Sequence, residues 1–128
     1  IGSSLDLFNT VKSIIGDKKF VVSDDGFDLT PTLLKKERSS REIIYYYLGS
    51  ELMAIRKGEF KLLINDMYID GFNKNIIKNK ISLYNIINDP SESKNIIFGN
   101  EKLVEELLDE LKIHKQKIVI KKSQLDLN

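Results

Sequence analysis

The sequence has no cysteine, one histidine and two prolines in 128 residues. The lack of cysteine excludes disulfides, thiolate zinc sites and a cysteine nucleophile within these residues. No apolar run approaches the ~20 residues of a membrane-spanning helix, and no secretory signal is visible. The sequence therefore leaves the compartment open and predicts neither a membrane span nor a metal site of its own.

The charge is almost balanced, with 20 basic and 19 acidic residues and a net charge of +1. A nucleic-acid-binding domain normally carries a basic excess, so the total charge does not support a nucleic-acid partner. The length suits one domain, and the apolar fraction of 41% is that of a globular protein. Because the chain starts at Ile1 rather than Met, we expect it to be a piece of a longer protein.

The first part of the chain has helical periodicity. Ser4 is expected to cap a helix that ends at Gly16, since apolar residues recur at helical spacing (Leu5, Phe8, Val11, Ile14 and Ile15). Residues 17–28 indicate a loop. A proline at a favoured first position then predicts a short helical turn over residues 30–34. Residues 35–42 are a charged linker.

The pattern changes to strands at Ile43. Strands are expected over residues 43–48, 52–56, 60–65 and 81–84, with a tight turn at Lys57-Gly58. In the third strand the alternation directs three side chains to the core (Phe60, Leu62 and Ile64). Residues 66–80 are polar and rich in asparagine and lysine, and we interpret them as an excursion from the sheet.

The last part of the chain is helical. Asp89 and Pro90 are expected to start a helix, with Asp89 as the cap and Glu92 reaching back to it. A final helix over residues 101–114 carries an apolar stripe (Leu103, Val104, Leu107, Leu108 and Leu111). Residues 118–120 would form an edge strand. The fold class expected is α+β, with a four-stranded antiparallel sheet packed against the C-terminal helix and preceded by a helix-loop segment.

Three local patterns occur in one order along the chain. Residues 5–10 and 25–29 read LDLFNT and DGFDL, residues 53–62 read MAIRKGEFKL after three tyrosines, and residues 83–96 read LYNIINDPSESKNI. Together they resemble the end of the sulfatase family. The first pair is similar to the family's D-L-F-P-T helix and D-G-x-D/S-L, with Asn9 in place of proline; the second is similar to A-V-R-x-G-x-[WY]-K-L, and the third to L-Y-[DN]-L-x-x-D-P-x-E-x-x-N-L.

The resemblance implies an alkaline-phosphatase-like superfamily fold and a division of the chain. Residues 1–42 would be the end of the catalytic domain, and residues 43–128 the sulfatase C-terminal subdomain. The parent protein would be an arylsulfatase-like enzyme that hydrolyses sulfate esters with formylglycine and calcium. This fragment would hold no catalytic or metal residue, because neither proline is followed two residues on by arginine, as the family's C/S-x-P-x-R motif requires. Its partners would be the catalytic domain in cis and, for the parent, a sulfated small molecule or glycan.

Several residues are candidates for binding. Polar residues in the 66–80 excursion are the expected substrate contacts (Tyr68, Lys74, Asn75 and Lys78, with Asp70 beside them); the alternative is a solvated hairpin loop. Basic side chains of the hairpin fit an anion site or, as we favour, a solvated face or a salt bridge (Arg56, Lys57 and Lys61). Residues 45–47, three tyrosines, fit sugar stacking or, preferably, packing. His114 is interpreted as a surface residue that favours the helix dipole.

Two other functional classes stay open. One is a fragment of a related phosphate or phosphonate ester hydrolase, which the upstream nucleophile motif would distinguish. The other is a stand-alone carbohydrate-binding or interaction module, which glycan binding without a companion domain would favour. A remnant with a purely structural role is a third alternative.

Overall fold

The computed structural model describes residues 1–16, 25–70 and 73–118, and the side chains of residues 67–70, 73–76, 78 and 79 lie outside the described part. The chain forms two compact units, Ile1–Ile44 and Tyr45–Asn128. The predicted edge strand at 118–120 falls mostly outside the described residues.

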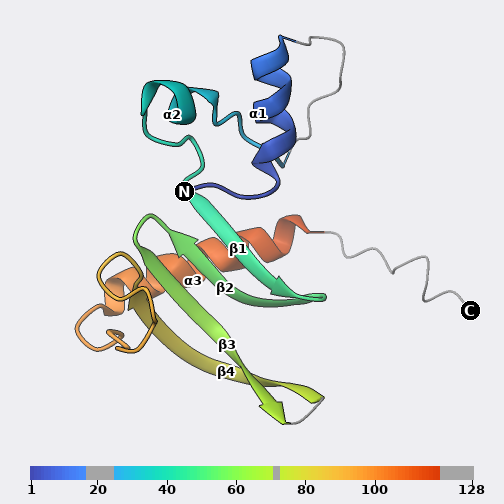
Figure 1. The fold of residues 1–128 in the computed structure, drawn as a ribbon. Coiled ribbons are helices and arrows are strands. Elements are labelled where there is room, and N and C mark those ends of the chain that lie inside the picture. Colours follow the sequence, from blue (N-terminus) through green and yellow to red (C-terminus); the bar gives the residue numbers. More distant parts are fainter. Residues whose placement is uncertain (17–24, 71–72, 119–128) are drawn as a thin grey trace, which may run out of the picture. The chain divides into compact units, whose positions relative to one another are not determined.

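The first unit holds two helices, α1 (Asp6–Ile15) and α2 (Thr30–Lys35) (Figure 1). The predicted stop of α1 at Gly16 is confirmed, because this residue is left-handed, with φ 69°, and its N–H reaches back to the last turn. The predicted cap at Ser4 is wrong. Leu5 precedes the helix without a side-chain cap, and Asp6 accepts the N–H of Ser3 instead, at 2.8 Å. The predicted short helical turn with a proline at its start is confirmed as α2.

The second unit is built on a four-stranded sheet in the order β1-β2-β3-β4. The strands are β1 (Ile43–Leu48), β2 (Glu51–Lys57), β3 (Phe60–Asp70) and β4 (Asn73–Asn85). Consecutive strands are neighbours, so the sheet is an antiparallel meander, as predicted. Gly49 and Gly58 lie between strands with φ 60°, a conformation that side-chain-bearing residues rarely adopt.

The predicted excursion at residues 66–80 is wrong. These residues extend β3 and β4, whose ladder runs from Phe60↔Asn85 to Asp70↔Asn73. Among the described pairings, β2 accompanies β3 only as far as Ala54↔Leu63, so the ribbon continues with two strands (Figure 1). The sequence of these residues is polar and lacks the apolar alternation that identifies a half-buried strand, which is why it resembled a loop.

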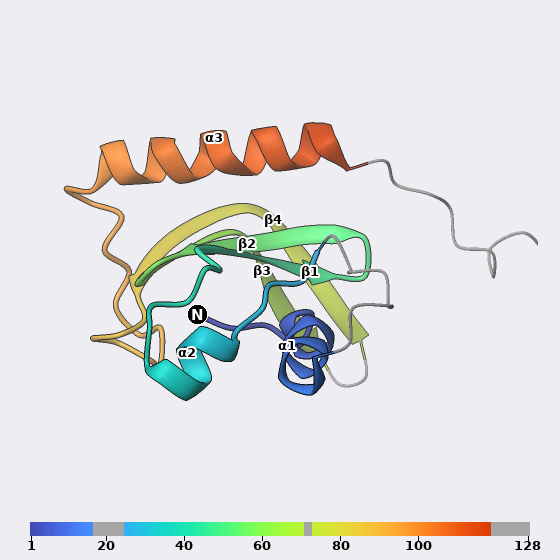
Figure 2. The ribbon, with the colours of Figure 1, turned by 90° about the horizontal axis from the view of Figure 1, so that it is seen from above.

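One face of the sheet is covered by α3 (Glu101–Lys117), which crosses the strands obliquely (Figures 1 and 2). A row of three fully buried side chains crosses the sheet, because Ile55 pairs with Leu62 and Leu62 with Leu83. The helix adds its predicted stripe, of which Val104, Leu107 and Leu111 are buried. Each fully buried leucine contributes about 2 kcal/mol of transfer free energy. This layer is the core of the second unit.

The segment between β4 and α3 is not helical. Residues 89–92, predicted to start a helix, form part of a loop over residues 86–100. Asp89 does cap backbone groups, but they belong to this loop: its Oδ2 accepts the N–H of Lys94 at 2.8 Å. Glu92 does not reach back to a cap, since its φ is 54° and its carboxylate pairs with Lys61 at 2.6 Å.

Candidate functional site

The predicted substrate contacts lie on the two-stranded ribbon, which we call the arm (residues 65–78). In its ladder Asn65 pairs with Lys78, Tyr68 with Asn75, and Ile69 with Lys74. The backbone therefore brings three of the four predicted contacts into adjacent rungs near the tip of the arm, and Lys78 at its base. Their side chains lie outside the described part, and substrate binding by them stays a prediction.

The base of the arm is fixed to the sheet. Asn65 is buried, and its Nδ2 donates to the backbone oxygen of Leu52 on β2 at 2.8 Å. The register of the ladder shifts between Leu63 and Asn65, at the point where the arm begins. Lys80 pairs with Asp66 at 2.5 Å, and this carboxylate raises the pKa of the lysine. The arm therefore leaves the sheet from an anchored base.

The lysines of the basic hairpin form ion pairs with acidic side chains of the same chain. Lys57 lies 2.8 Å from a carboxylate oxygen of Glu106 and 3.1 Å from one of Glu110, both on α3, and these bonds raise its pKa. Lys61 pairs with Glu92, and its ammonium lies 5.0 Å from the ring centre of Tyr46. The favoured interpretation as salt bridges is confirmed for both lysines.

The tyrosines of β1 divide between the two faces of the sheet. Tyr45 and Tyr47 meet His114 of α3, whereas Tyr46 meets Lys61 on the opposite face. The imidazole stacks on Tyr45, and its Nε2 lies 2.8 Å from the hydroxyl of Tyr47. Packing, the favoured role for these rings, is confirmed. His114 lies in the last turn of α3, as interpreted, but it is half-buried against these rings, and burial, with Lys117 adding to it, lowers its pKa.

Two open hollows border α3. One, of about 470 Å³, is lined by the β1–β2 turn together with Tyr47, Lys115 and Ile118. The second has the same volume and is lined by Ile64 and Ile81 of the sheet against Leu108 and Leu111. Within the described residues, no group of three or more His, Cys, Asp or Glu side chains is placed to hold a metal ion.

The first unit contains a buried ion pair that the sequence analysis missed. Asp6 is fully buried, and Arg41 donates to it from Nε at 2.8 and 2.9 Å and from Nη2 at 2.5 Å. Arg41 also donates to the backbone oxygen of Asp25, and its guanidinium lies 4.7 Å from the centre of the Phe27 ring. The Arg41 hydrogen bond, with the N–H groups of Phe27 and Ser3, lowers the pKa of Asp6 to about 2 despite burial.

Within the expected charged linker over residues 35–42, Arg41 is buried by this ion pair. The polar side chains that follow Asp6 on α1 support the same junction. Asn9 donates to the oxygen of Gly26 at 2.5 Å, and Thr10 accepts the N–H of Leu29 at 3.0 Å. The signal was available as three polar residues (Asp6, Asn9 and Thr10) at helical spacing on one face of α1.

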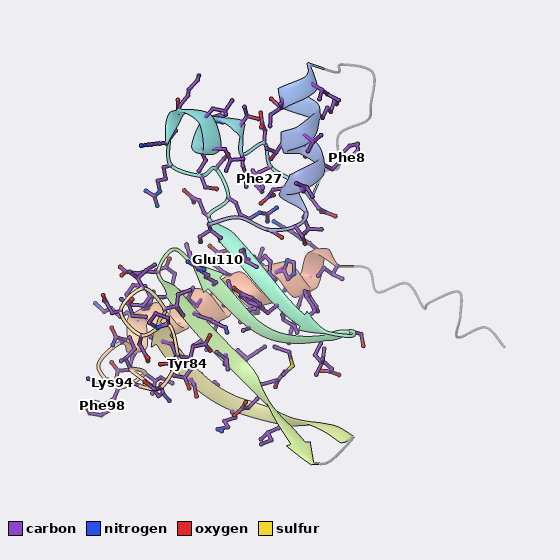
Figure 3. All side chains as sticks on the ribbon, in the orientation of Figure 1. Phe8, Phe27, Tyr84, Lys94, Phe98 and Glu110 are labelled. Atoms are coloured by element: carbon purple, nitrogen blue, oxygen red, sulfur yellow. The ribbon has the colours of Figure 1, made fainter. Side chains whose placement is uncertain are left out.

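Apart from Lys12 and Ser13, the remaining side chains of α1 are apolar and exposed, as is that of Leu5 just before the helix. The exposed fraction lies between 46% and 66% for each of six residues (Leu5, Leu7, Phe8, Val11, Ile14 and Ile15). Phe8 is labelled on α1 in Figure 3. Contiguous exposed apolar surface of this kind marks a site of protein interaction.

A family profile for the C-terminal region of aryl-sulfatase matches residues 39–128. The chain belongs to this family. The sulfatase C-terminal region is 45% identical over 64 residues to mouse N-acetylgalactosamine-6-sulfatase, covering 48% of this chain and 12% of that protein. It is 28% identical over 142 residues to human arylsulfatase A, covering 98% of this chain and 27% of the relative. The chain thus spans about a quarter or less of these curated relatives.

Solved structures share the fold of this sulfatase C-terminal region. A structure from work on the metabolism of multiple glycosaminoglycans by Bacteroides thetaiotaomicron is 26% identical, with a TM-score of 0.65, over 88% of this chain and 24% of that one. A sulfatase from Pseudoalteromonas sp. is 18% identical, with a TM-score of 0.75, over 87% of this chain and 25% of its own. The predicted α+β fold and family are confirmed. Among the described residues, no helix is long and apolar enough to cross a membrane.

Proposed function

We propose that the protein containing this sulfatase C-terminal region hydrolyses sulfate esters, and that the region works in cis with a catalytic domain. Residues 1–42 would complete the edge of that domain, and residues 43–128 would form the subdomain beside it. The observation that carries this proposal is the family match over residues 39–128. The exposed apolar face of α1 supports it, because such a face is stable in water only when another surface covers it.

The chemistry would lie outside this chain. Formylglycine and calcium on the catalytic domain would supply the nucleophile and the charge stabilisation for cleavage of the sulfate ester. The chain itself has no cysteine for conversion to formylglycine. Its own contribution would be to bury an apolar face of the larger domain and to shape the substrate cleft.

The arm is the part of the region that we assign to the cleft. Its base is held by Asn65 and by the Lys80–Asp66 ion pair, so the tip is presented from a fixed root. The lysines and the tyrosine of the arm suit a sulfated small molecule or glycan, because lysine attracts sulfate oxygens and tyrosine packs on sugar rings. The contacts would come from four residues (Tyr68, Lys74, Asn75 and Lys78).

The experiment uses the full-length protein. Hydrolysis of 4-nitrophenyl sulfate, with little or none of 4-nitrophenyl phosphate, is the expected result. Preference for the phosphate would instead assign the protein to the phosphate ester hydrolases. No hydrolysis of either ester, together with glycan binding by these 128 residues alone, would favour a stand-alone module.

The arm is tested by shortening it. Asn65 and Lys78 are paired, so an Asn-Gly turn that replaces residues 66–77 can close the hairpin at that rung. We expect kcat/KM for a sulfated oligosaccharide to fall more than tenfold, while that for 4-nitrophenyl sulfate stays within about twofold. The matched variant keeps the arm and changes Lys74 and Lys78 to alanine. An equal effect on both substrates would contradict a role of the arm in substrate binding.

A further inference from the structure

The most exposed large apolar side chain of the described residues is that of Phe98, with an exposed fraction of 93%. It lies in the loop between β4 and α3, at the periphery of the second unit (Figure 3). Single exposed apolar residues are common on protein surfaces, so exposure alone carries no inference. What distinguishes Phe98 is the way its backbone is held.

Phe98 occupies the second position of a tight turn. The N–H of Asn100 donates to the oxygen of Ile97 at 3.2 Å, and Gly99 between them has φ 83°. Positive φ at the third position is typical of a type II turn and favours glycine there. The N–H of Gly99 donates to the Glu101 carboxylate at 2.9 Å, and the amide of Asn100 donates to the oxygen of Ile96 at 2.7 Å. The turn is thus closed by three hydrogen bonds around Phe98.

The turn is also attached to the core of the sheet. Ile96 donates its N–H to the oxygen of Leu83 at 2.8 Å, and the N–H of Leu83 donates to Oδ1 of Asn95 at 3.0 Å. The same oxygen accepts the N–H of Ile97 at 3.1 Å. Leu83 is fully buried, so the base of the turn is bonded to the buried core of the unit.

We propose that Phe98 is a docking anchor that inserts into an apolar pocket on the part of the same protein that lies outside this chain. The inference rests on the proposed function, which supplies a catalytic domain in cis. The chain spans only 12% to 27% of its curated relatives, so most of such a protein is available as the second surface. Lys94 and Glu101 are exposed on either side of Phe98 in sequence, which gives the aromatic anchor the polar surroundings usual at an interface.

A rigid turn lowers the entropic cost of docking, because the aromatic ring is already presented before contact. Large aromatic side chains that fill a pocket carry most of the binding free energy of an interface. Phe98 therefore adds a contact that is separate from the apolar face of α1. It would hold the end of the sheet, at the start of α3, against the rest of the protein.

The first test places the photo-crosslinker p-benzoylphenylalanine at position 98 of the full-length protein. We expect an intramolecular crosslink to a residue outside these 128 residues, located by mass spectrometry. The matched control carries the crosslinker at Glu105, an exposed position of α3. Crosslinks only between copies, only within the 128 residues, only to added lipid vesicles, or none at all would overturn the proposal.

The second test measures thermal unfolding of full-length variants. Phe98→Ser should lower Tm by about 3 °C, on the scale expected for loss of one buried side chain in a large protein, and Phe98→Leu should lower it less. Ile87→Ser, at another exposed position of the same loop, should leave Tm unchanged. Equal Tm for Phe98→Ser and the wild type would contradict the anchor. Sulfate ester hydrolysis by the wild type is scored separately, so this proposal can fail while the proposed function stands.

Discussion

The imidazole of His114 lies flat against the phenol ring of Tyr45, with 3.4 Å between the ring centres and 4° between the planes. The same imidazole is hydrogen-bonded to the hydroxyl of Tyr47. One side chain near the end of α3 thus joins the helix to two positions of β1. This contact attaches β1 to α3. None of the side chains of β1 is fully buried, so the strand adds little to the core.

His114 should titrate below its usual pKa of 6.5, because burial and the charge of Lys117 both disfavour the imidazolium. A base with a lowered folded pKa stabilises the fold above its unfolded pKa. That contribution should therefore decline as the pH falls from above 6.5 through the folded pKa. The chain has one histidine, so its NMR titration is read without assignment. Lys117→Gln should raise the pKa; a wild-type pKa at or above 6.5 would refute this account.

The Asp6–Arg41 pair should make the first unit sensitive to loss of either partner. Asp6→Asn leaves the guanidinium buried without its counter-charge, which costs about 3 kcal/mol. Amide hydrogen exchange of α1 measures the effect as lost protection. The double variant Asp6→Leu with Arg41→Met should be less damaging than Asp6→Asn, because it leaves no charge behind. Greater damage by the double variant would show that the pair is net stabilising.

The same pair sets an acid limit. The pKa of Asp6 is about 2 in the folded chain against its usual 3.8, so its contribution is complete above pH 4 and is lost as the pH falls toward 2. Protection of α1 should fall over that window in the wild type. Asp6→Asn should remove that part of the pH dependence. If the protection of α1 still falls over the same pH range in the variant, another group causes the acid sensitivity.

Gly26 should not tolerate a side chain. A Cβ there would lie 2.5 Å from the backbone oxygen of Leu5 and 2.8 Å from the amide nitrogen of Asn9. Because the first of these atoms is backbone, Gly26→Ala has to displace the loop from α1 and should lower the stability of this unit by 1 kcal/mol or more, on the scale of about 1–3 kcal/mol for overpacking. Gly2→Ala is the milder comparison. A Cβ at Gly2 would lie 3.2 Å from the end of the flexible Leu29 side chain. Equal tolerance at both positions would contradict the close approach.

Asp89 should order its loop rather than start a helix. Its carboxylate accepts the Lys94 N–H and the hydroxyls of Ser91 and Ser93, and the backbone N–H groups chiefly lower its pKa to about 2. Asp89→Ala should remove exchange protection from the Lys94 amide, whereas Asp109→Ala on α3 should not. The protection should persist to about pH 3 in the wild type, since the folded carboxylate stays ionised above its pKa. Loss of the Lys94 amide protection near pH 4 would show instead that the pKa of Asp89 is close to its usual value of 3.8.

Much of the fold was predictable because the relevant signals are local. The alternation of Phe60 and Leu62, the glycine of the β2–β3 turn and the stripe of α3 each specify an element without reference to the rest of the chain. The arm was not predictable, because its polar sequence lacks the apolar alternation of a half-buried strand and is as compatible with a loop as with a two-stranded ribbon. Its register depends on pairings such as Tyr68↔Asn75, which no periodicity reveals.

The chemistry of single residues was harder to foresee. His114 looks like a helix-end cation until the sheet brings Tyr45 against it, and Asp6 looks like a first-turn acid until Arg41 approaches across 35 positions of sequence. Both contacts join segments far apart in the chain, so local composition carries no information on them. The family motifs located the region, but they did not locate these contacts.

The Asp6–Arg41 pair also bears on where the region can be cut. The family match begins at residue 39, so it includes the arginine and leaves out the aspartate. A recombinant piece trimmed to that boundary would expose a guanidinium whose hydrogen-bonding partners have been removed with α1. The helix and the sheet subdomain should therefore be expressed, crystallised or transplanted together, because the boundary defined by sequence similarity passes through a buried electrostatic contact.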